Sequence, residues 1–359
     1  LTNTGTLNAT GAGSVLTIAP TTWSGAGVVS ATAGGTVNLG GTFPTAALAQ
    51  LSNVGGTVNL TGTLDNTAAT MVFSTATGVV NLVGGTIVGG TLQKTGIGDL
   101  VMTASSTLNN VILDMDFTVT NGTQLFLAGT AFTIAATRTL HLVSTTSISD
   151  VVVAPSTGTT YTINGPGTIS FEGTGINNRI FTNSGSTLTL PANLAFTGTG
   201  NAQFFNFTTI NNQATIQSTT AGQSISISAG TINNTGTLRS SGGTMTLTDL
   251  ANLTGGTVQV DTGGTLTLAG PWTNAGALTV TGGTLNLGGT FSALTTGAGT
   301  FNRAGGVVTV NLTGTFNNGG TFVFNATTGV INLAGGNIVG GTLQKTGIGD
   351  LVMTASSTL

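Results

Sequence analysis

The chain has 359 residues, of which 4% are charged, with 58 glycines, no cysteine and a formal net charge of −3 at neutral pH. A helical protein is excluded, because Gly, Thr and Asn are poor helix formers and few ion pairs could support a helix. Disorder is excluded because 39% of the residues are hydrophobic and can be buried. The absence of a basic stripe argues against nucleic acid or an anionic membrane as a partner, and no apolar run is long enough for a transmembrane helix.

Short strands are predicted along the chain, each opened by a turn glycine and followed by alternating apolar residues. The pattern occurs at residues 35–39, 56–60, 78–82 and 98–102, and again at 243–247, 264–268, 283–287, 329–333 and 349–353. Alternation puts the apolar side chains on one face of a strand. A spacing of about 21 residues suits one rung of a solenoid, whereas a propeller blade needs about 40. We therefore predict an all-β fold, a parallel β-helix (β-solenoid) of about 21 residues per rung and about 17 rungs.

A second, longer repeat is superimposed on the rungs. Residues 87–108 read IVGGTLQKTGIGDLVMTASSTL, and residues 338–359 repeat them identically, 251 residues further along the chain. Trp23 similarly aligns with Trp272, and Lys94 with Lys345. We predict that residues 1–359 form one continuous β-solenoid, a fragment that begins and ends inside a tandem array. The two lysines are expected to be exposed charges at strand ends that discourage lateral sheet pairing.

The middle of the chain, residues 110–230, is less regular and is predicted to carry longer loops on the same solenoid. Three Ile-Asn-Asn segments, at residues 176–178, 210–212 and 232–234, are predicted to be corners whose asparagines form ladders along the stack. The more reactive side chains of this region are Asp114, Asp116, Asp150, Tyr161, Glu172 and Arg179.

Catalytic and metal chemistry find few candidates. A polysaccharide-cleaving β-helix needs an acid and a base within reach of one substrate, and it would require a groove that gathers Asp150, Glu172 and Arg179. Asp114 and Asp116 face the same side of a strand and are the candidate ligands for Ca²⁺, but the calcium-binding glycine repeat is missing. We expect no catalytic residues, no metal and no cofactor.

Residues 90–102 read GTLQKTGIGDLVM, and residues 341–353 repeat them. This stretch resembles the autotransporter-associated β-strand repeat, which has a G-T-L strand, a K-x-G-x-G turn and an L-x-L strand. The Thr-Gly-Thr-Leu and Ile-Asn-Asn elements also resemble the passenger regions of large bacterial adhesins and haemagglutinins. The resemblance implies a secreted right-handed β-helix at the bacterial cell surface.

The leading functional hypothesis is a non-enzymatic section of a giant repetitive surface or extracellular fibre. Its partners would be further copies of itself, joined in tandem or docked head to tail into a filament. An adhesin that binds glycans or host surfaces is the alternative, with its surface site near Tyr161, Arg179, Asp150 and Glu172. Two further hypotheses are a polysaccharide-cleaving enzyme and an ice-binding solenoid that presents rows of threonine.

Overall fold

The computed structural model describes residues 1–154, 158–175, 178–183, 185–304 and 307–359. The fold is all-β: parallel strands stack into a β-solenoid of about 15 turns with about 22 residues per turn. The helical content of the described residues is one 3-10 turn, Thr45–Leu48, and none of their helices is long and apolar enough to cross a membrane. The chain divides into two units, Leu1–Ser156 with Tyr161–Arg179, and Thr157–Thr160 with Ile180–Leu359.

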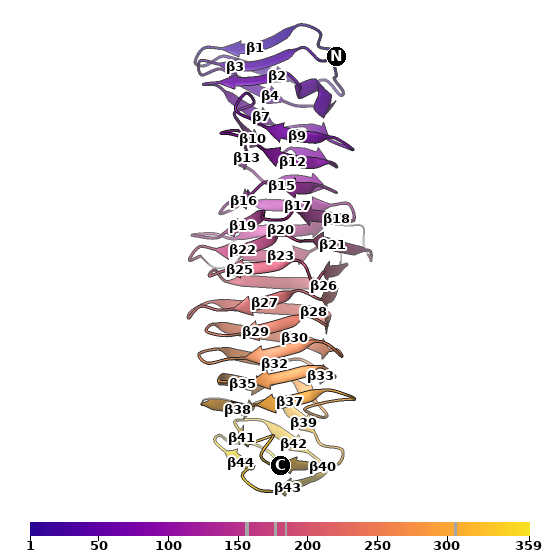
Figure 1. Ribbon diagram of the computed structural model, residues 1–359, viewed down its shortest axis with the longest axis vertical. Helices are drawn as coiled ribbons and strands as arrows, with labels where there is room; N and C mark the ends of the chain where they lie inside the picture. The colour runs from indigo at the N-terminus through magenta and orange to yellow at the C-terminus, as the bar shows by residue number, and fades with distance from the viewer. Residues whose placement is uncertain (155–157, 176–177, 184, 305–306) are drawn as a thin grey trace. The chain divides into compact units, whose positions relative to one another are not determined.

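In the first unit, each turn adds one strand to each of several parallel sheets (Figure 1). The first two sheets comprise β1 (Thr6–Thr10), β3 (Val28–Thr32) and β6 (Leu51–Val54), and β2 (Val15–Ile18), β4 (Thr36–Leu39), β7 (Thr57–Leu60), β10 (Val79–Leu82) and β13 (Asp99–Met102). A third run comprises β5 (Thr42–Pro44), β8 (Thr63–Asp65), β11 (Thr86–Val88), β14 (Ser106–Asn109), β17 (Gln124–Ala128) and β20 (Ser149–Ala154). The remaining runs are β9 (Thr70–Phe73), β12 (Thr91–Lys94), β15 (Ile112–Asp114), β18 (Ala131–Ile134) and β21 (Thr160–Asn164), and β16 (Phe117–Val119), β19 (Thr139–Val143) and β22 (Thr168–Glu172).

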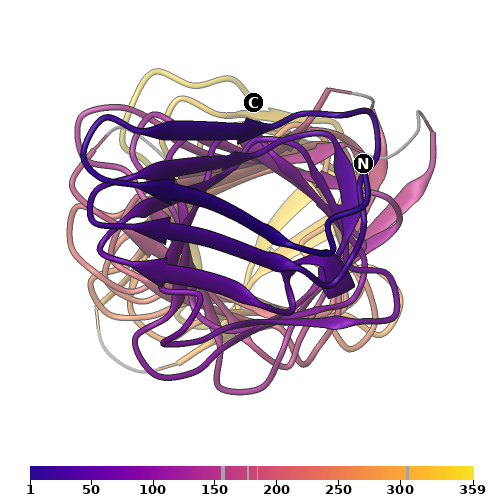
Figure 2. The ribbon, with the colours of Figure 1, turned by 90° about the horizontal axis from the view of Figure 1, so that it is seen from above.

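The core of the first unit consists of columns of like apolar side chains. Leu39, Leu60, Leu82 and Met102 pair in register on β4, β7, β10 and β13, and each is at most 2% exposed. The residues before them, Asn38, Asn59, Asn81 and Val101, face outward, as the alternation predicts, and three of these four are polar. Figure 2 looks down on the first turns, where the chain winds around the centre that such columns fill.

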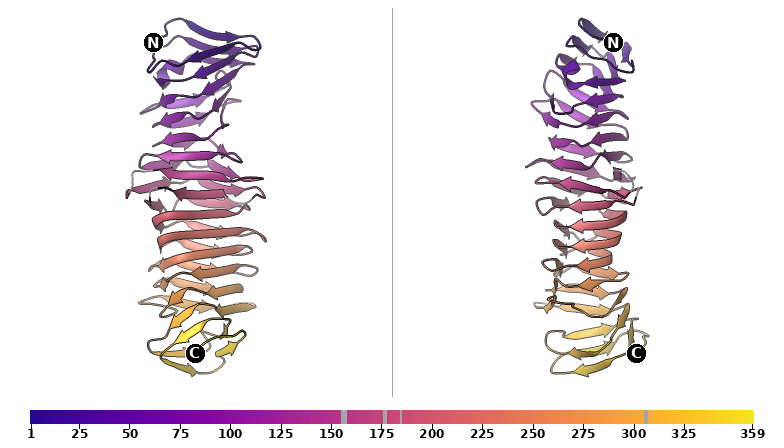
Figure 3. Two further views of the ribbon diagram at one scale, coloured as in Figure 1. Left: turned by 180° about the vertical axis from the view of Figure 1, so that it is seen from behind. Right: turned by 90° about the vertical axis from the view of Figure 1, so that its right-hand side faces the viewer.

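The second unit repeats this construction, and its strands lie one below another in Figure 3. β23 (Asn178–Thr182) carries the boundary between the units. The longest run comprises β24 (Thr187–Leu190), β26 (Ala202–Asn212), β28 (Ser224–Asn234), β30 (Thr244–Asn252), β32 (Thr265–Ala269), β35 (Gly283–Leu287), β38 (Val308–Leu312), β41 (Val330–Leu333) and β44 (Asp350–Met353). The others are β25 (Ala195–Gly198), β27 (Thr215–Ser218), β29 (Thr237–Ser240), β31 (Thr257–Val260), β34 (Ala277–Val280) and β37 (Thr300–Arg303); β33 (Thr273–Asn274), beside β30; β36 (Thr290–Phe291), β39 (Thr315–Asn317) and β42 (Asn337–Val339); and β40 (Thr321–Phe324) with β43 (Thr342–Lys345).

The predicted parallel β-helix is confirmed, while the number of turns is lower than predicted. Longer turns in the middle of the chain account for the difference, since Gln124 pairs with Asp150 and Thr139 pairs with Thr168. Insertions of this kind leave the register of the strands intact, because they lengthen only the connecting loops. The predicted corner at residues 176–178 begins outside the described residues.

The long repeat is visible as a repeated local structure. Trp23 is buried, donates its indole N–H to the carbonyl of Gly40 at 3.0 Å and stacks on Phe43 with ring centroids 4.5 Å apart. In the second unit, Trp272 donates to Gly288 at 2.9 Å and stacks on Phe291 at 4.3 Å. The two copies of the sequence therefore build the same corner.

Candidate functional site

Asp150 and Arg179 form the most deeply buried ion pair of the described residues. Arg179 donates Nε to Oδ1 at 2.7 Å and Nη2 to Oδ2 at 2.6 Å, while Gln124 adds a bond to Oδ2 at 2.9 Å. The side chain of Asp150 is 0% exposed, and the side chain of Arg179 is 25% exposed. Two parallel bonds of this kind fix both partners, and the hydrogen bond from Arg179 to Asp150 raises the pKa of the guanidinium. With its side chain 0% exposed, the carboxylate is not accessible to a substrate on the surface.

Glu172, the second acid proposed for a catalytic groove, has a different partner. Its Oε1 lies 2.6 Å from Nδ1 of His141. Burial acts to raise the pKa of Glu172, but hydrogen bonds from His141 and Ser170 outweigh it and leave the pKa below its ordinary value. Asp150 and Glu172 thus bond to separate partners and do not form an acid–base pair.

Tyr161 lies in the core rather than on the surface. Its side chain is fully buried, and its hydroxyl donates to the carbonyl of Ala128 at 3.4 Å. Burial raises the pKa of the phenol. The placement of Tyr161 and Asp150 in a surface-binding region was therefore wrong for both side chains, while Arg179 and Glu172 keep partly exposed groups.

Asp114 and Asp116 accept hydrogen bonds from different groups. Asp114 accepts hydrogen bonds from Arg138 Nε at 2.9 Å and Gln93 Nε2 at 2.8 Å, and these bonds lower its pKa. Asp116 accepts from the backbone N–H of Thr139 at 2.9 Å. Ca²⁺ needs six to eight oxygen ligands, and within the described ranges no three His, Cys, Asp or Glu side chains gather to hold a metal.

The other charged pairs join sequence neighbours or adjacent turns. Lys94 bonds to Asp99 at 2.5 Å and Lys345 to Asp350 at 2.7 Å, each pair closing the same turn in one copy of the repeat. Arg239 bonds to Asp261 at 2.5 Å. Sequence reasoning identified the lysines as exposed charges but missed their acidic partners, although the five-residue spacing across a Gly-x-Gly turn was a usable signal.

Asparagine ladders run along the stack on the outside and inside of the solenoid. On the outer face, Asn59 donates to Asn38 at 2.9 Å and Asn81 donates to Asn59 at 3.0 Å. Inside the corner of the second unit, four buried asparagines bond in sequence at 2.7–2.8 Å: Asn212, Asn234, Asn252 and Asn274. The predicted corners at 210–212 and 232–234 thus include this buried ladder.

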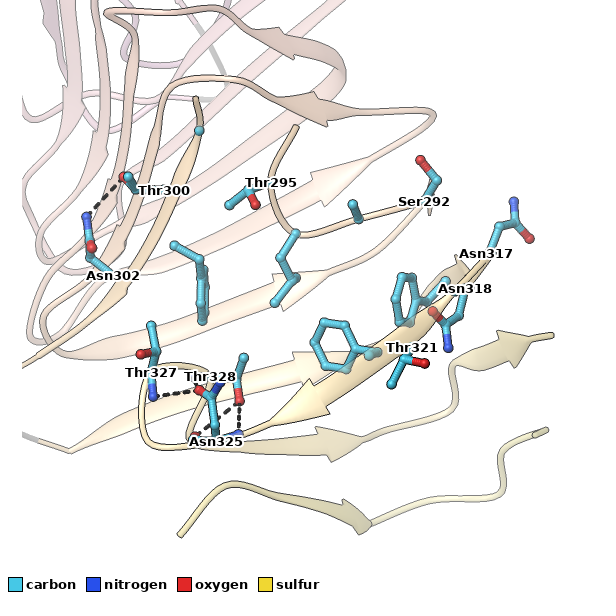
Figure 4. Close-up of a pocket in the computed structure, with 18 residues that line it drawn as sticks. Ser292, Thr295, Thr300, Asn302, Asn317, Asn318, Thr321, Asn325, Thr327 and Thr328 are labelled. Atoms are coloured by element: carbon cyan, nitrogen blue, oxygen red, sulfur yellow. Dashed lines mark hydrogen bonds between the residues drawn. The ribbon is translucent and has the colours of Figure 1, made fainter. Parts of the chain in front are cut away.

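The second unit also contains a hollow of about 790 Å³ between two successive turns (Figure 4). Phe301, Phe316 and Phe322 line its apolar side, and none of its lining residues is charged. Its polar lining comprises Ser292, Thr295, Thr300, Asn302, Asn317, Asn318, Thr321, Asn325, Thr327 and Thr328. The two copies of the long repeat differ in sequence at this hollow. The first copy reads Asn-Thr-Ala-Ala-Thr from residue 66, whereas the second is one residue shorter and reads Asn-Gly-Gly-Thr from residue 318. This difference was the signal in the sequence that the second copy departs from the first here.

On one face of the first unit, the threonine row is a single residue wide. Thr42, Thr63, Thr86 and Thr107 pair in register along one edge of the first unit. The next outward-facing column on the same strands holds Pro44, Asp65, Val88 and Asn109. A flat array of paired threonines is therefore not formed on this face.

Comparison with protein-family models, curated proteins and solved structures finds no match to this chain. The fold and the partners of each side chain are consequently the basis for the functional argument.

Proposed function

We propose that this chain is a non-enzymatic structural section of a repetitive bacterial cell-surface or extracellular fibre, extended by stacking turns. The observation that carries the proposal is that both copies of the long repeat form the same corner. Trp23 with Phe43 and Trp272 with Phe291 form the same stacked corner. Repeating the sequence therefore repeats the geometry of a turn, which is how a rod of any length is specified.

The partners of the charged side chains support this proposal. Asp150, Asp114 and Glu172 each bond to a basic or imidazole group on another turn. Acidic groups held in such pairs stabilise stacking, and a general acid or base needs a position within reach of a substrate instead. The resemblance of residues 90–102 to a repeat of secreted bacterial proteins supports the location.

Electron microscopy and fibre diffraction of native material test the proposal. We expect filaments with a reflection near 4.8 Å along the filament axis, the spacing of hydrogen-bonded strands. Compact particles without that reflection would contradict it. Protease treatment of intact cells tests the location, because surface material is digested while a cytoplasmic marker is not.

A second candidate function, an adhesin that binds neutral saccharides, is favoured by the hollow of Figure 4. Its aromatic side and amide and hydroxyl rim match the apolar face and hydroxyl groups of a sugar, and it offers no charge to attract an ion. Ligand sites commonly combine an apolar lining with a few polar groups. On a glycan array, Asn317→Asp should abolish binding while Asn8→Asp in the first unit leaves it unchanged; equal binding by all three proteins would remove this candidate.

A further inference from the structure

A second hollow, of about 420 Å³, adjoins the hollow of Figure 4 within the second unit. Ser292 and Asn317 line both hollows. In Figure 4, these two residues lie on the opposite side of the view from Thr300 and Asn302. The second hollow therefore extends the first beyond the side that carries Ser292 and Asn317.

The lining of the second hollow is polar and carries one charge. Thr231, Thr273 and Thr290 line it beside the buried Trp272. Asp249 is the one charged side chain among the described residues of this lining, and neither hollow is lined by a described Lys, Arg or His. The lining therefore offers a negative charge that none of its own described residues neutralises.

The carboxylate of Asp249 has no partner among the described residues. The chain has 9 acidic residues, and all of them lie within the described ranges. Apart from Asp249, each accepts a hydrogen bond from a basic side chain, a histidine or a backbone N–H. The side chain of Asp249 makes no hydrogen bond or ion pair with the described residues, although it is half-buried. A half-buried carboxylate without a donor is unfavourable, so a ligand that supplies a donor would be stabilised there.

The backbone leaves this carboxylate uncovered. Asp249 has a φ of 61°, a conformation that glycine adopts freely and aspartate adopts at a cost. Thr248 pairs with Ala269, which places Gly270 at the same corner one turn later, with a φ of 63°. A Cβ on Gly270 would overlap Oδ1 of Asp249, so the carboxylate lies against a residue that has no side chain to cover it. An unpaired charge on an uncommon backbone conformation indicates a functional position.

We propose that the two hollows form one groove for a saccharide chain, in which Asp249 binds a protonated amino group on the ring that fills the second hollow. This ligand extends the second candidate function, on which the proposal rests, from a neutral sugar to a chain that contains an amino sugar. Hydrogen bonds between a carboxylate and a cationic donor are about twice as strong as those between neutral groups. The unpaired charge therefore favours an amine over a hydroxyl, and Ser292 and Asn317 lie where the chain passes from one hollow to the other.

Other ligands of a lone carboxylate fit these hollows less well. Ca²⁺ needs six to eight oxygen ligands, and no three metal-binding side chains gather in the parts of the chain that the structure describes. A lysine side chain of a peptide would supply the cation, but it would bring no ring to the aromatic side of the first hollow, which Phe301, Phe316 and Phe322 line. An amino-sugar chain uses both the aromatic side of one hollow and the carboxylate of the other.

Isothermal titration calorimetry with two matched probes tests the inference. The first probe is the β-1,4-linked tetramer of N-acetylglucosamine, and the second is the same tetramer with the acetyl group removed from one terminal ring, at either end. We expect the protein to bind the second probe about tenfold more tightly, because only that probe brings an ammonium group to Asp249. The dimer of N-acetylglucosamine should bind more weakly than its tetramer, because the longer chain reaches both hollows.

Asp249→Asn removes the charge and keeps the corner, since Asn206 already adopts the same conformation with a φ of 64°. This variant should bind both tetramers equally, with its affinity for the neutral tetramer unchanged. Asp116→Asn is the matched control, because it removes the same charge from an exposed residue of the first unit and should leave the preference intact. Circular dichroism confirms that both variants keep their strands.

Equal binding of the two tetramers, or a preference that survives in Asp249→Asn, would overturn the inference and leave the second candidate function in place. Binding of neither tetramer would also overturn it, and the glycan array with Asn317→Asp then decides the second candidate function separately. Binding of tetralysine that depends on Asp249, without binding of either tetramer, would overturn the inference in favour of a peptide ligand.

Discussion

Removing one amide from the buried asparagine ladder tests how this solenoid holds its corners. Asn234 accepts a hydrogen bond from Asn212 at 2.8 Å and donates to Asn252 at 2.8 Å. It also donates to the carbonyl of Thr257 at 3.2 Å, and its side chain is fully buried. In Asn234→Ala, the side-chain oxygen Oδ1 of Asn252 loses the donor that Asn234 supplies, and the side chain of Asn252 remains buried.

The magnitude follows from the desolvated groups. A buried acceptor without a partner costs about 1–3 kcal/mol, and the lost bonds and cavity add to it, so Asn234→Ala should lower the free energy of unfolding by about 2–4 kcal/mol. Asn234→Asp should cost more, because it places a carboxylate against the side-chain oxygen Oδ1 of Asn252 in a buried site.

Asn233→Ala is the matched control on the same strand. Asn233 is half-buried and donates its side-chain amide to Asn211 at 3.0 Å, in an outer pair beside the buried ladder. Water can replace that bond, so the expected cost is at most about 1 kcal/mol. Urea unfolding measures both variants, with the midpoint compared at constant slope. Equal costs at positions 233 and 234 would refute the argument that burial makes the inner ladder indispensable.

Three further outcomes are expected. Trp272→Phe should destabilise the second unit by about 1–2 kcal/mol through its lost indole hydrogen bond, and the near-ultraviolet dichroism spectrum should lose part of the tryptophan signal. Arg179→Met should lower the free energy of unfolding by about 3–5 kcal/mol, because it leaves the buried carboxylate of Asp150 without its cation; a small change in the urea midpoint would argue against this. The hydrogen bond from Arg138 holds the pKa of Asp114 below its unfolded value, so the pair stabilises the fold above about pH 4 and this stability is lost as the pH falls through the folded pKa; Arg138→Met should reduce this acid dependence in thermal unfolding measured from pH 7 to pH 2.

The candidate site was less accessible to sequence reasoning than the fold. Asp150 and Glu172, which the sequence places one turn apart, bond to Arg179 and His141. Whether two outward side chains on adjacent turns come into contact depends on the lengths of the loops and on the side-chain rotamers. Loop length and rotamer leave no periodic signal in the sequence. The burial of Tyr161 was missed for the same reason, because an aromatic residue in an irregular segment can face either way.

Sequence alone determined the all-β class, the parallel stack, the length of a turn and the long repeat. Those properties follow from alternation and periodicity, which act locally and add up along the chain. Tertiary structure decided the environment of each side chain. Asp116 and Asp150 both lie in the irregular middle of the chain, yet Asp116 is exposed and accepts a backbone N–H from Thr139, while the side chain of Asp150 is 0% exposed and bonds to Arg179. The neighbouring turn decides whether such a side chain is buried, and the local sequence does not show which residues that turn brings.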